Sequence, residues 1–420
     1  MAHPRTPGLK FIVVTLFLDI LGIGLIVPIL PRLLESFVGN DMVAGTRLFG
    51  VFSAVYALMQ FVFSPIIGSL SDRFGRRPVL LLSNFGSAFD YLLLALAPSL
   101  PWFFLGRVVS GICGASIATA AAYIADVSPP EKRAQNFGLI GMSFGLGFTA
   151  GPFLAALLGQ QDVRLPFYVS GALSLANALY GLFVLPESLP KALRRPFQWS
   201  RANPFGALQQ LFRYPVVLGL AGAVFFITLA QRGMMAVWVN YTEFRYQWDV
   251  KATGYSLGVV GLCAALVQGG LVRRVLPMLG ERRSIVFGAI VAATAFALYG
   301  VATEGWMIYA IAVMGSLAGF SPPAAQGLMS RAVPATEQGL LQGGLASLTS
   351  ITNVLGPLLA TNIFGFFISP ASPLYVPGAP FFFCSALILV GLALAVRTFG
   401  RLPLAPAAAA PFSGAVDPSQ

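Results

Sequence analysis

Four charged side chains stand inside long apolar stretches of this sequence. They are Asp19, Asp90, Arg107 and Arg232. An ionised side chain at the centre of a bilayer costs at least about 2.5–3.5 kcal/mol. A carboxyl group there takes up a proton readily, whereas an arginine stays charged and can hold a carboxylate ionised or bind an anionic group. The chemistry on offer is proton binding and charge pairing within a membrane.

Each of these charges also has a purely structural interpretation. A charged side chain near a helix end can reach the membrane interface, and a charge pair can simply hold helices together. Asp19 and Asp90 lie far from the ends of their apolar stretches, which favours a functional role. Arg107 opens RVVSGICGA, whose small residues allow another helix to approach closely. For Arg232 both interpretations stay open.

The elements that must position these side chains are membrane-spanning helices. Of the 420 residues, 57% are hydrophobic and 10% are charged, whereas soluble domains carry about 25% charged residues. A span needs about 20 apolar residues. The segments of this kind are 9–31, 48–70, 79–97, 102–124, 135–158, 167–186, 215–241, 254–276, 284–302, 305–329, 339–368 and 380–399. We therefore expect an all-α integral membrane protein, and the first segment is too long for a cleaved signal peptide.

The twelve segments divide into two halves that repeat. The expected units are an N-terminal six-helix half at 1–186, a central linker at 187–214, a C-terminal six-helix half at 215–400 and a flexible tail at 401–420. The pair Gly151-Pro152 in the fifth segment returns 205 positions later as Gly356-Pro357 in the eleventh. In transporters with two such halves, the substrate site lies near the membrane midplane between them.

The basic residues predict the orientation. Of the 26 Lys and Arg residues, the loops opposite the N-terminus hold only Arg32, Arg47, Arg164, Arg245 and Lys251. Cytoplasmic loops carry the excess of Lys and Arg. We therefore expect a multi-pass protein of the cell (inner) membrane with both termini and the linker in the cytoplasm. The net charge of +11 needs no nucleic acid to explain it.

Other chemistries lack the residues that they need. The only histidine is His3, in the N-terminal tail, so histidine-based catalysis and proton relays are excluded. Cys113, Cys263 and Cys384 all fall in predicted spans, and their number and spacing make neither a disulfide framework nor a metal site. We expect no enzyme activity, no metal and no cofactor.

One loop combines charges with turn residues, in the sequence GSLSDRFGRRP at 68–78. Gly75 permits a tight turn, and the arginines that follow hold the loop on the cytoplasmic side. Asp72 can pair with a nearby arginine and with the positive N-terminal end of a helix of the other half. Such a contact, made in one state and broken in the other, would latch the cytoplasmic side. The alternative is that the arginines only set the topology.

The fifth segment has a smooth helix face. In GLIGMSFGLGFTAGP, Gly147 and Gly151 stand four positions apart and Pro152 follows them. Small residues at this spacing let a helix slide or rock against a neighbour, and the proline adds a bend. Close packing alone would explain the glycines equally well.

Taken together, these motifs resemble a known family. GSLSDRFGRRP resembles the loop signature between spans two and three of major facilitator transporters. LDILGIGLIVPILP, RVVSGICGA and GLGFTAGP resemble the first-, fourth- and fifth-span motifs of the drug:proton antiporters. The similarity to tetracycline efflux pumps is close in FDYLLLALAPSLPWFFLGRVVSGICGASIATAAAYIAD and LQGGLASLTSITNVLGPLL. It covers nearly the whole chain and implies the major facilitator fold, with 12 transmembrane helices in two pseudo-symmetric halves.

The resemblance, together with the residue patterns, assigns expected roles. They are proton coupling for Asp19, Asp90 and Arg107, substrate cavity for Gln60, Arg232 and Gln268, gating loop for Gly68, Asp72, Gly75 and Arg76, and conformational helix for Gly147, Gly151 and Pro152. Three positions depart from the pumps. The pumps carry a histidine in span eight and an acid in span nine, where this chain has Ala264 and Ala292, and Arg232 replaces a neutral polar residue. These departures leave open whether tetracycline itself is carried.

The expected function is proton-coupled antiport that exports amphipathic small molecules by alternating access. The fold does not exclude the alternative of a proton-coupled transporter for an endogenous metabolite or sugar-like solute. A receptor or membrane-embedded enzyme would need an extramembrane domain or a catalytic pair, which the sequence lacks. The expected partners are a small-molecule substrate, protons and the lipid bilayer, without nucleic acid, and we expect a monomer.

Overall fold

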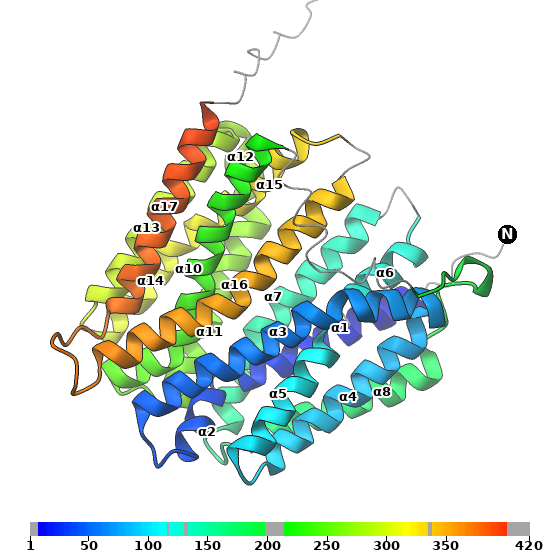
Figure 1. Cartoon of the computed structure of the whole chain (residues 1–420), viewed down its shortest axis with the longest axis horizontal. Helices are drawn as coiled ribbons and strands as arrows, with labels where there is room; N and C mark the ends of the chain where they lie inside the picture. Colours follow the sequence, from blue (N-terminus) through cyan, green and yellow to red (C-terminus); the bar gives the residue numbers. More distant parts are fainter. Residues whose placement is uncertain (1–6, 116, 130–132, 198–213, 335–337, 401–420) are drawn as a thin grey trace, which may run out of the picture.

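The computed structural model describes residues 7–115, 117–129, 133–197, 214–334 and 338–400. Long helices lie side by side in two groups (Figure 1). The N-terminal half contains α1 (Pro7–Ile26), α2 (Leu30–Ser36), α3 (Met42–Phe74), α4 (Arg76–Leu96), α5 (Leu100–Gly114), α6 (Ile117–Val127), α7 (Arg133–Leu158) and α8 (Leu165–Val184). The predicted tail at 401–420 and most of the predicted linker lie outside the described residues.

The C-terminal half follows the short 3₁₀ turn η2 (Lys191–Leu193). Its elements are α10 (Pro215–Tyr246), α11 (Val250–Leu266), the π-helical η4 (Val267–Leu271), α12 (Val272–Leu279), α13 (Glu281–Val301), α14 (Gly305–Ser316), the 3₁₀ turn η5 (Leu317–Phe320), α15 (Ser321–Arg331), α16 (Gln338–Phe367) and α17 (Ala379–Phe399).

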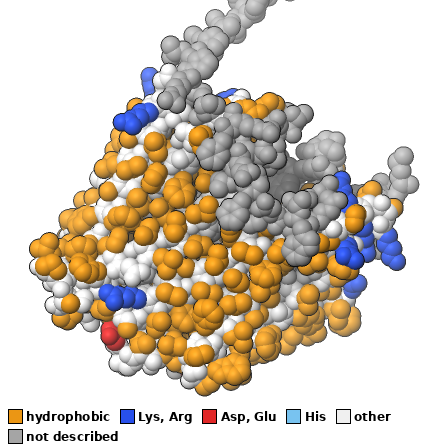
Figure 2. Space-filling model, viewed as in Figure 1, with side chains coloured by type: hydrophobic (Ala, Val, Ile, Leu, Met, Phe, Trp, Pro, Cys, Tyr) orange, Lys and Arg blue, Asp and Glu red, His pale blue; other side chains and the backbone are white. Residues whose placement is uncertain are grey.

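These helices have the length and composition of membrane spans. Among the described residues ten continuous spans qualify, and the bent pair α1 and α2 makes an eleventh. The helix α7, with a shorter apolar stretch at Met142–Leu158, occupies the fifth predicted span. Large apolar side chains such as Leu82 and Phe183 point outward, and hydrophobic side chains cover most of the face in Figure 2. The chain is therefore a multi-pass membrane protein, as predicted.

Several predicted spans are interrupted helices. Between α1 and α2 the chain bends by 43°, close to Pro28 and Pro31, because proline removes a backbone donor and crowds the preceding turn. The eighth span contains the π-helical turn η4, and the tenth contains the 3₁₀ turn η5. Bends of this kind give a helix two parts that can move separately.

The bundle has two ends, which we name by what they carry. The linker face carries Gly75, Gly280 and the described linker residues 187–197, and the far face carries α2. Both glycines start a helix with positive φ, 107° at Gly75 and 74° at Gly280. The two halves therefore make the same turn at positions 205 residues apart.

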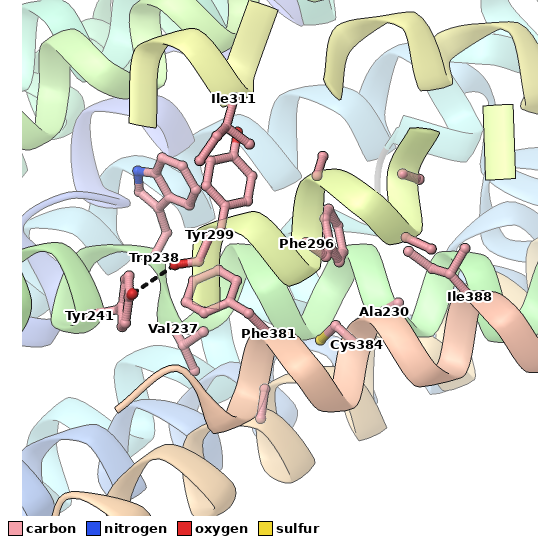
Figure 3. Close-up of a cluster of buried hydrophobic side chains, with 14 of the residues drawn as sticks. Ala230, Val237, Trp238, Tyr241, Phe296, Tyr299, Ile311, Phe381, Cys384 and Ile388 are labelled. Atoms are coloured by element: carbon pink, nitrogen blue, oxygen red, sulfur yellow. Dashed lines mark hydrogen bonds between the residues drawn. The ribbon is translucent and has the colours of Figure 1, made fainter. Parts of the chain in front are cut away.

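At the far face the two halves share their cores. The aromatic cluster of the C-terminal half is built around Trp238, Tyr299 and Phe381 (Figure 3). Val27 and Met42 of the N-terminal half pack against this cluster. In return, the main N-terminal core includes residues from α10 and α11 of the other half. Apolar contact therefore seals the far face.

At the linker face the cores are separate. The cluster around Phe11, Leu80 and Tyr123 contains only residues of the N-terminal half. The cluster around Leu220 and Ile285 contains only residues of the C-terminal half. Within the described part of the chain, buried apolar clusters thus join the two halves at the far face but not at the linker face.

Candidate functional site

Asp90 of α4 and Arg107 of α5 lie together inside the N-terminal half, with exposed fractions of 1% and 7%. Arg107 Nη2 is 3.9 Å from Asp90 Oδ2, which is too far for a hydrogen bond. Ser110 lies between them. Its hydroxyl accepts from Arg107 Nη2 at 3.0 Å and donates to Asp90 Oδ2. Asp90 and Arg107 are therefore linked through the hydroxyl of Ser110, which lies one helical turn after the arginine.

The guanidinium of Arg107 is also held by aromatic faces. Its carbon lies 5.9 Å from the ring centre of Tyr56 and 5.8 Å from that of Phe103, a distance at which a cation is attracted to a ring. Asp90 Oδ1 and Arg107 Nε are buried without a hydrogen-bond partner. Asp90 Oδ1 can therefore still accept a proton or a hydrogen bond, and Arg107 Nε can still donate a hydrogen bond to a water or a substrate group.

Gln60 of α3 joins this group through the backbone of α5. Its side-chain amide donates to the carbonyl of Gly114 at 3.1 Å. Gly111 makes the approach possible, because a Cβ there would lie 2.5 Å from the carbonyl oxygen of Tyr56. The small residues of RVVSGICGA thus bring α3 against α5 and place Gln60 at the end of the helix that carries Arg107.

Asp19 of α1 faces the same region. It is half-buried, and among the described residues it has no hydrogen-bond or ion-pair partner. Its carboxyl group is close enough to act electrostatically on Tyr56, Tyr91 and Cys113. The structure therefore groups Asp19, Asp90 and Arg107 within one polar region of the N-terminal half, where Asp19 is the member left unpaired.

The predicted conformational helix packs against the helix that carries Asp19. A Cβ at Gly151 would lie 2.6 Å from the Cα atom of Gly24, and a Cβ at Gly24 would lie 3.2 Å from Pro152. A Cβ at Gly147 would meet Ile20, the neighbour of Asp19, at 2.9 Å. The glycines of α7 thus set the position of α1 and of its carboxyl group.

In the C-terminal half, two residues that are predicted to line the substrate cavity have exposed side chains within membrane-spanning helices. Arg232 lies midway along α10 and, among the described residues, has no hydrogen-bond or ion-pair partner. Gln268 is exposed within the π-helical turn η4. Ala264 is half-buried, whereas Ala292 is 5% exposed within the aromatic core. In this state Ala292 therefore packs within the core of its own half.

At the linker face, Arg76 contacts polar and charged side chains within and beside the predicted gating loop. Its Nη1 donates to Ser71 Oγ at 2.6 Å and lies 2.6 Å from Asp72 Oδ1. Its Nε donates to Asp126 Oδ2 at 3.2 Å. The contacts join α3, α4 and α6 into one unit. Gly68, one turn before Asp72, has no neighbouring atom within 4 Å of a Cβ placed on it, so this stretch of α3 borders open space.

The linker closes over this loop. Glu187 Oε1 accepts from the backbone N–H of Arg76 at 2.8 Å, and Glu187 Oε2 lies 3.6 Å from Arg194 Nη2. The backbone N–H of Arg195 donates to the carbonyl of Asp72 at 3.1 Å. A side chain at Gly75 would collide with Glu187. The glycine is therefore required both by its backbone angle and by the acid that caps α4.

The C-terminal half repeats the Arg76–Asp126 pair with its charges exchanged. At 205 positions beyond Arg76 and Asp126 stand Glu281 and Arg331, and they form an ion pair of their own. Each pair ties the first turn of one helix to the end of another, α4 to α6 and α13 to α15. The sign of the charges is free to differ because only the pairing matters for this tie.

Sequence reasoning expected an arginine beside Asp72 but missed Ser110, Asp126 and Glu187 as partners of the charged residues. Ser110 could have been found from its position three residues after Arg107, on the same helix face. Asp126 and Glu187 follow long stretches of chain, and no local signal pairs them with Arg76. No cluster of three or more His, Cys, Asp or Glu able to hold a metal occurs within the described residues.

Comparison with known proteins agrees with this architecture. Residues 12–299 match the Major Facilitator Superfamily. The chain is 41% identical to the tetracycline resistance protein, class C, of Escherichia coli, over 83% of this chain and 88% of that protein. It is 39% identical to the class D protein of Salmonella ordonez, over 85% and 89%.

Two solved structures show the same fold. The human organic anion transporter MFSD10 (TETRAN) has 25% identity and a TM-score of 0.65, over 93% of this chain and 99% of that one. A bacterial homolog of the human lysosomal transporter Spinster has 18% identity and a TM-score of 0.76, over 97% and 100%. With its helical halves, its gating-loop motif and relatives about 40% identical over most of its length, this chain belongs to the Major Facilitator Superfamily of membrane transporters.

Proposed function

We propose that this protein is a proton-coupled antiporter that exports amphipathic small molecules by alternating access. The observation that carries the proposal is the group of Asp19, Asp90, Ser110 and Arg107 inside the membrane-spanning bundle. One carboxylate is held by a cation through a hydroxyl, and the other has no partner. Such a group can exchange a proton for a polar or charged group of a substrate.

The proposed coupling is a competition for these carboxyl groups. Loss of a proton from Asp19 leaves a negative charge in an apolar span, which is costly unless a substrate group or Arg107 neutralises it. Arrival of the substrate therefore favours proton release, and arrival of a proton favours substrate release. Because only one of the two is held at a time, the cycle exchanges them.

The loop charges support an orientation with the linker face in the cytoplasm, since Lys and Arg concentrate there. We place the protein in the inner membrane of a bacterial cell, as its bacterial relatives imply. In that orientation the apolar clusters that join the halves lie on the outer side, and we propose that this state accepts a substrate from the cytoplasm. The Asp72 latch would then form in the opposite state.

For the substrate, we propose drugs of the tetracycline type, which the names of the relatives indicate. The departures at Ala264 and Ala292 argue less strongly against tetracycline than they did in the sequence, because Ala292 is buried in the core. Resistance should be measured in a pump-deficient bacterial host for tetracycline and for a panel of lipophilic drugs. Absence of resistance to every compound would contradict drug export.

The decisive test of proton coupling is Asp19→Asn. We expect drug transport driven by a pH gradient in vesicles to fall to background, while the variant still folds and inserts. Proton release by the purified protein on drug addition should be lost as well. The matched control is Glu304→Gln, which removes an exposed acid at the far face. Gradient-driven transport by Asp19→Asn at the wild-type rate would refute the coupling role.

A second candidate substrate class is supported by Arg232. An unpaired, exposed guanidinium midway along a membrane helix attracts an anionic group, and one of the solved relatives is described as an organic anion transporter. Amphipathic anions should then compete with drug transport in the wild type, and Arg232→Gln should weaken that competition. Equal competition in both proteins would exclude this role for Arg232.

A further inference from the structure

Three polar contacts cross between the halves at the far face. Arg32 Nε lies 2.9 Å from Glu243 Oε2, and Arg32 Nη2 donates to the carbonyl of Trp248 at 2.7 Å. The side-chain amide of Asn240 donates to Glu35 Oε1 at 2.8 Å. All three join α2 of the N-terminal half to α10 of the C-terminal half or to Trp248, just beyond the end of α10. They can persist only while the far face is closed.

Glu35 is held tightly in this contact. Its exposed fraction is 8%, and α3 comes so close at Gly45 that a Cβ there would collide with the Glu35 side chain. The charged groups that act on Glu35 are Glu243 on α10, Asp41 at the start of α3 and Arg32 on its own helix. Arg32, the one cation among these groups, is already engaged by Glu243 and by the Trp248 carbonyl.

The hydrogen-bonding groups of Asn240 explain why a protonated Glu35 suits this site. Its Oδ1 atom is buried without a hydrogen-bond partner, although its amide N–H donates to Glu35. An ionised Glu35 can only accept, so it leaves that oxygen unsatisfied, which is costly in a buried site. A protonated Glu35 donates its O–H to the same oxygen. Acid and amide then form two reciprocal hydrogen bonds, and every polar atom between them is paired.

We propose that Glu35 is a second proton-binding site, distinct from Asp19 and Asp90, and that the proton it takes up completes the pair with Asn240 and stabilises the closed far face. When the far face opens, water reaches the carboxyl group and the proton leaves to that side. No bond other than the O–H bond forms or breaks. Closure of the far face is therefore favoured by acid on that side.

The proposal predicts a conformational equilibrium that depends on pH. Spin labels at Gln161→Cys and Thr303→Cys, exposed far-face positions on the two halves, should report it by distance measurement in a variant whose three native cysteines are replaced by alanine. A single carboxyl group can change the closed-to-open ratio by at most about tenfold per pH unit. We expect a rise of about tenfold or more between pH 8 and pH 5 in the wild-type background.

Two isosteric variants should respond in opposite ways. Glu35→Gln carries an amide that pairs with Asn240 as the neutral acid does, so it should stay closed at every pH. Asn240→Asp faces Glu35 with a second carboxyl group, so it should open at pH 8 and close at pH 5 more steeply than the wild type. Glu304→Gln, an exposed acid on the same face, should respond as the wild type does.

The proposal is overturned if Glu35→Gln follows the wild-type pH response, or if the wild type does not respond. The distance measurement needs no substrate and no proton gradient. The result of the distance measurement is therefore independent of the proposed antiport, which the Asp19→Asn vesicle assay tests.

Discussion

At the scale of single residues, the charged pair depends on a hydroxyl group. Ser110 is the only group within hydrogen-bond distance of both Asp90 and Arg107 among the described residues, and it turns a 3.9 Å separation into a connected chain. A hydrogen bond to a charged group contributes about 1.5–3 kcal/mol. The behaviour of the pair should therefore be sensitive to an uncharged residue.

Ser110→Ala should lower the proton-coupled transport rate by about 10- to 100-fold, because the hydrogen bonds of the relay are lost. The rate is measured in vesicles against an imposed pH gradient, with protein amount and thermal stability checked in parallel. Ser110→Thr keeps the hydroxyl and should retain most of the activity. Equal loss in both variants would indicate a packing role instead of a relay.

Ala292→Asp should destabilise the protein instead of improving tetracycline transport. The position is 5% exposed in an apolar cluster, and burying a charge without a partner typically costs several kcal/mol. We expect a clear fall in the unfolding temperature in detergent. Ala264→His, at a half-buried position, should leave that temperature nearly unchanged. A stable Ala292→Asp protein with raised tetracycline resistance would show that the position reaches the substrate in another state.

At the scale of elements, the contact between α1 and α7 positions the first carboxyl group. A Cβ at Gly151 would lie 2.6 Å from Gly24, backbone against backbone, so neither side can yield without a helix shift. Gly151→Leu should therefore reduce the folded yield and abolish transport. Gly145→Leu is the matched control on the same helix, because no atom lies within 4 Å of a Cβ there. Folded yield is measured by size-exclusion chromatography.

The spans could be predicted from sequence because each is a long apolar run, and burial in lipid forces a helix on such a run. The bend between α1 and α2 lies close to Pro28 and Pro31, whereas the π-helical turn η4 contains no proline and could not be predicted, because such a turn depends on what packs beside it. In the site, Asp19, Asp90 and Arg107 were recognisable from the cost of a charge in lipid. Asn240 and the buried position of Ala292 were not, because uncharged residues carry no such signal and their partners lie far away in the chain, whereas Ser110 lies only three residues after Arg107.

At the scale of the whole molecule, the rate at which the protein changes between its two conformational states should depend on Asp72. In the state described, its carboxylate contacts Arg76, so its substitution has little effect here and a larger effect where the linker face closes. Asp72→Asn should slow transport by about tenfold, as for the loss of one charged contact. Substrate affinity, measured by equilibrium binding, should stay within about twofold. Glu304→Gln should change neither value, and an equal fall in affinity and rate would contradict the latch.

Glu35 and Asn240 are separated by 205 positions, the interval between the two halves. A dimer of one ancestral six-helix unit would bring each such residue opposite its own copy at the two-fold axis. Two glutamates there would have to share a proton, and two asparagines would form a contact that no change of pH affects. A mixed pair requires the two halves to differ at this position, as they do in this chain. In the proposed site, the difference between the halves at this one position gives a single carboxyl group a neutral amide partner, so one proton is enough to complete the contact.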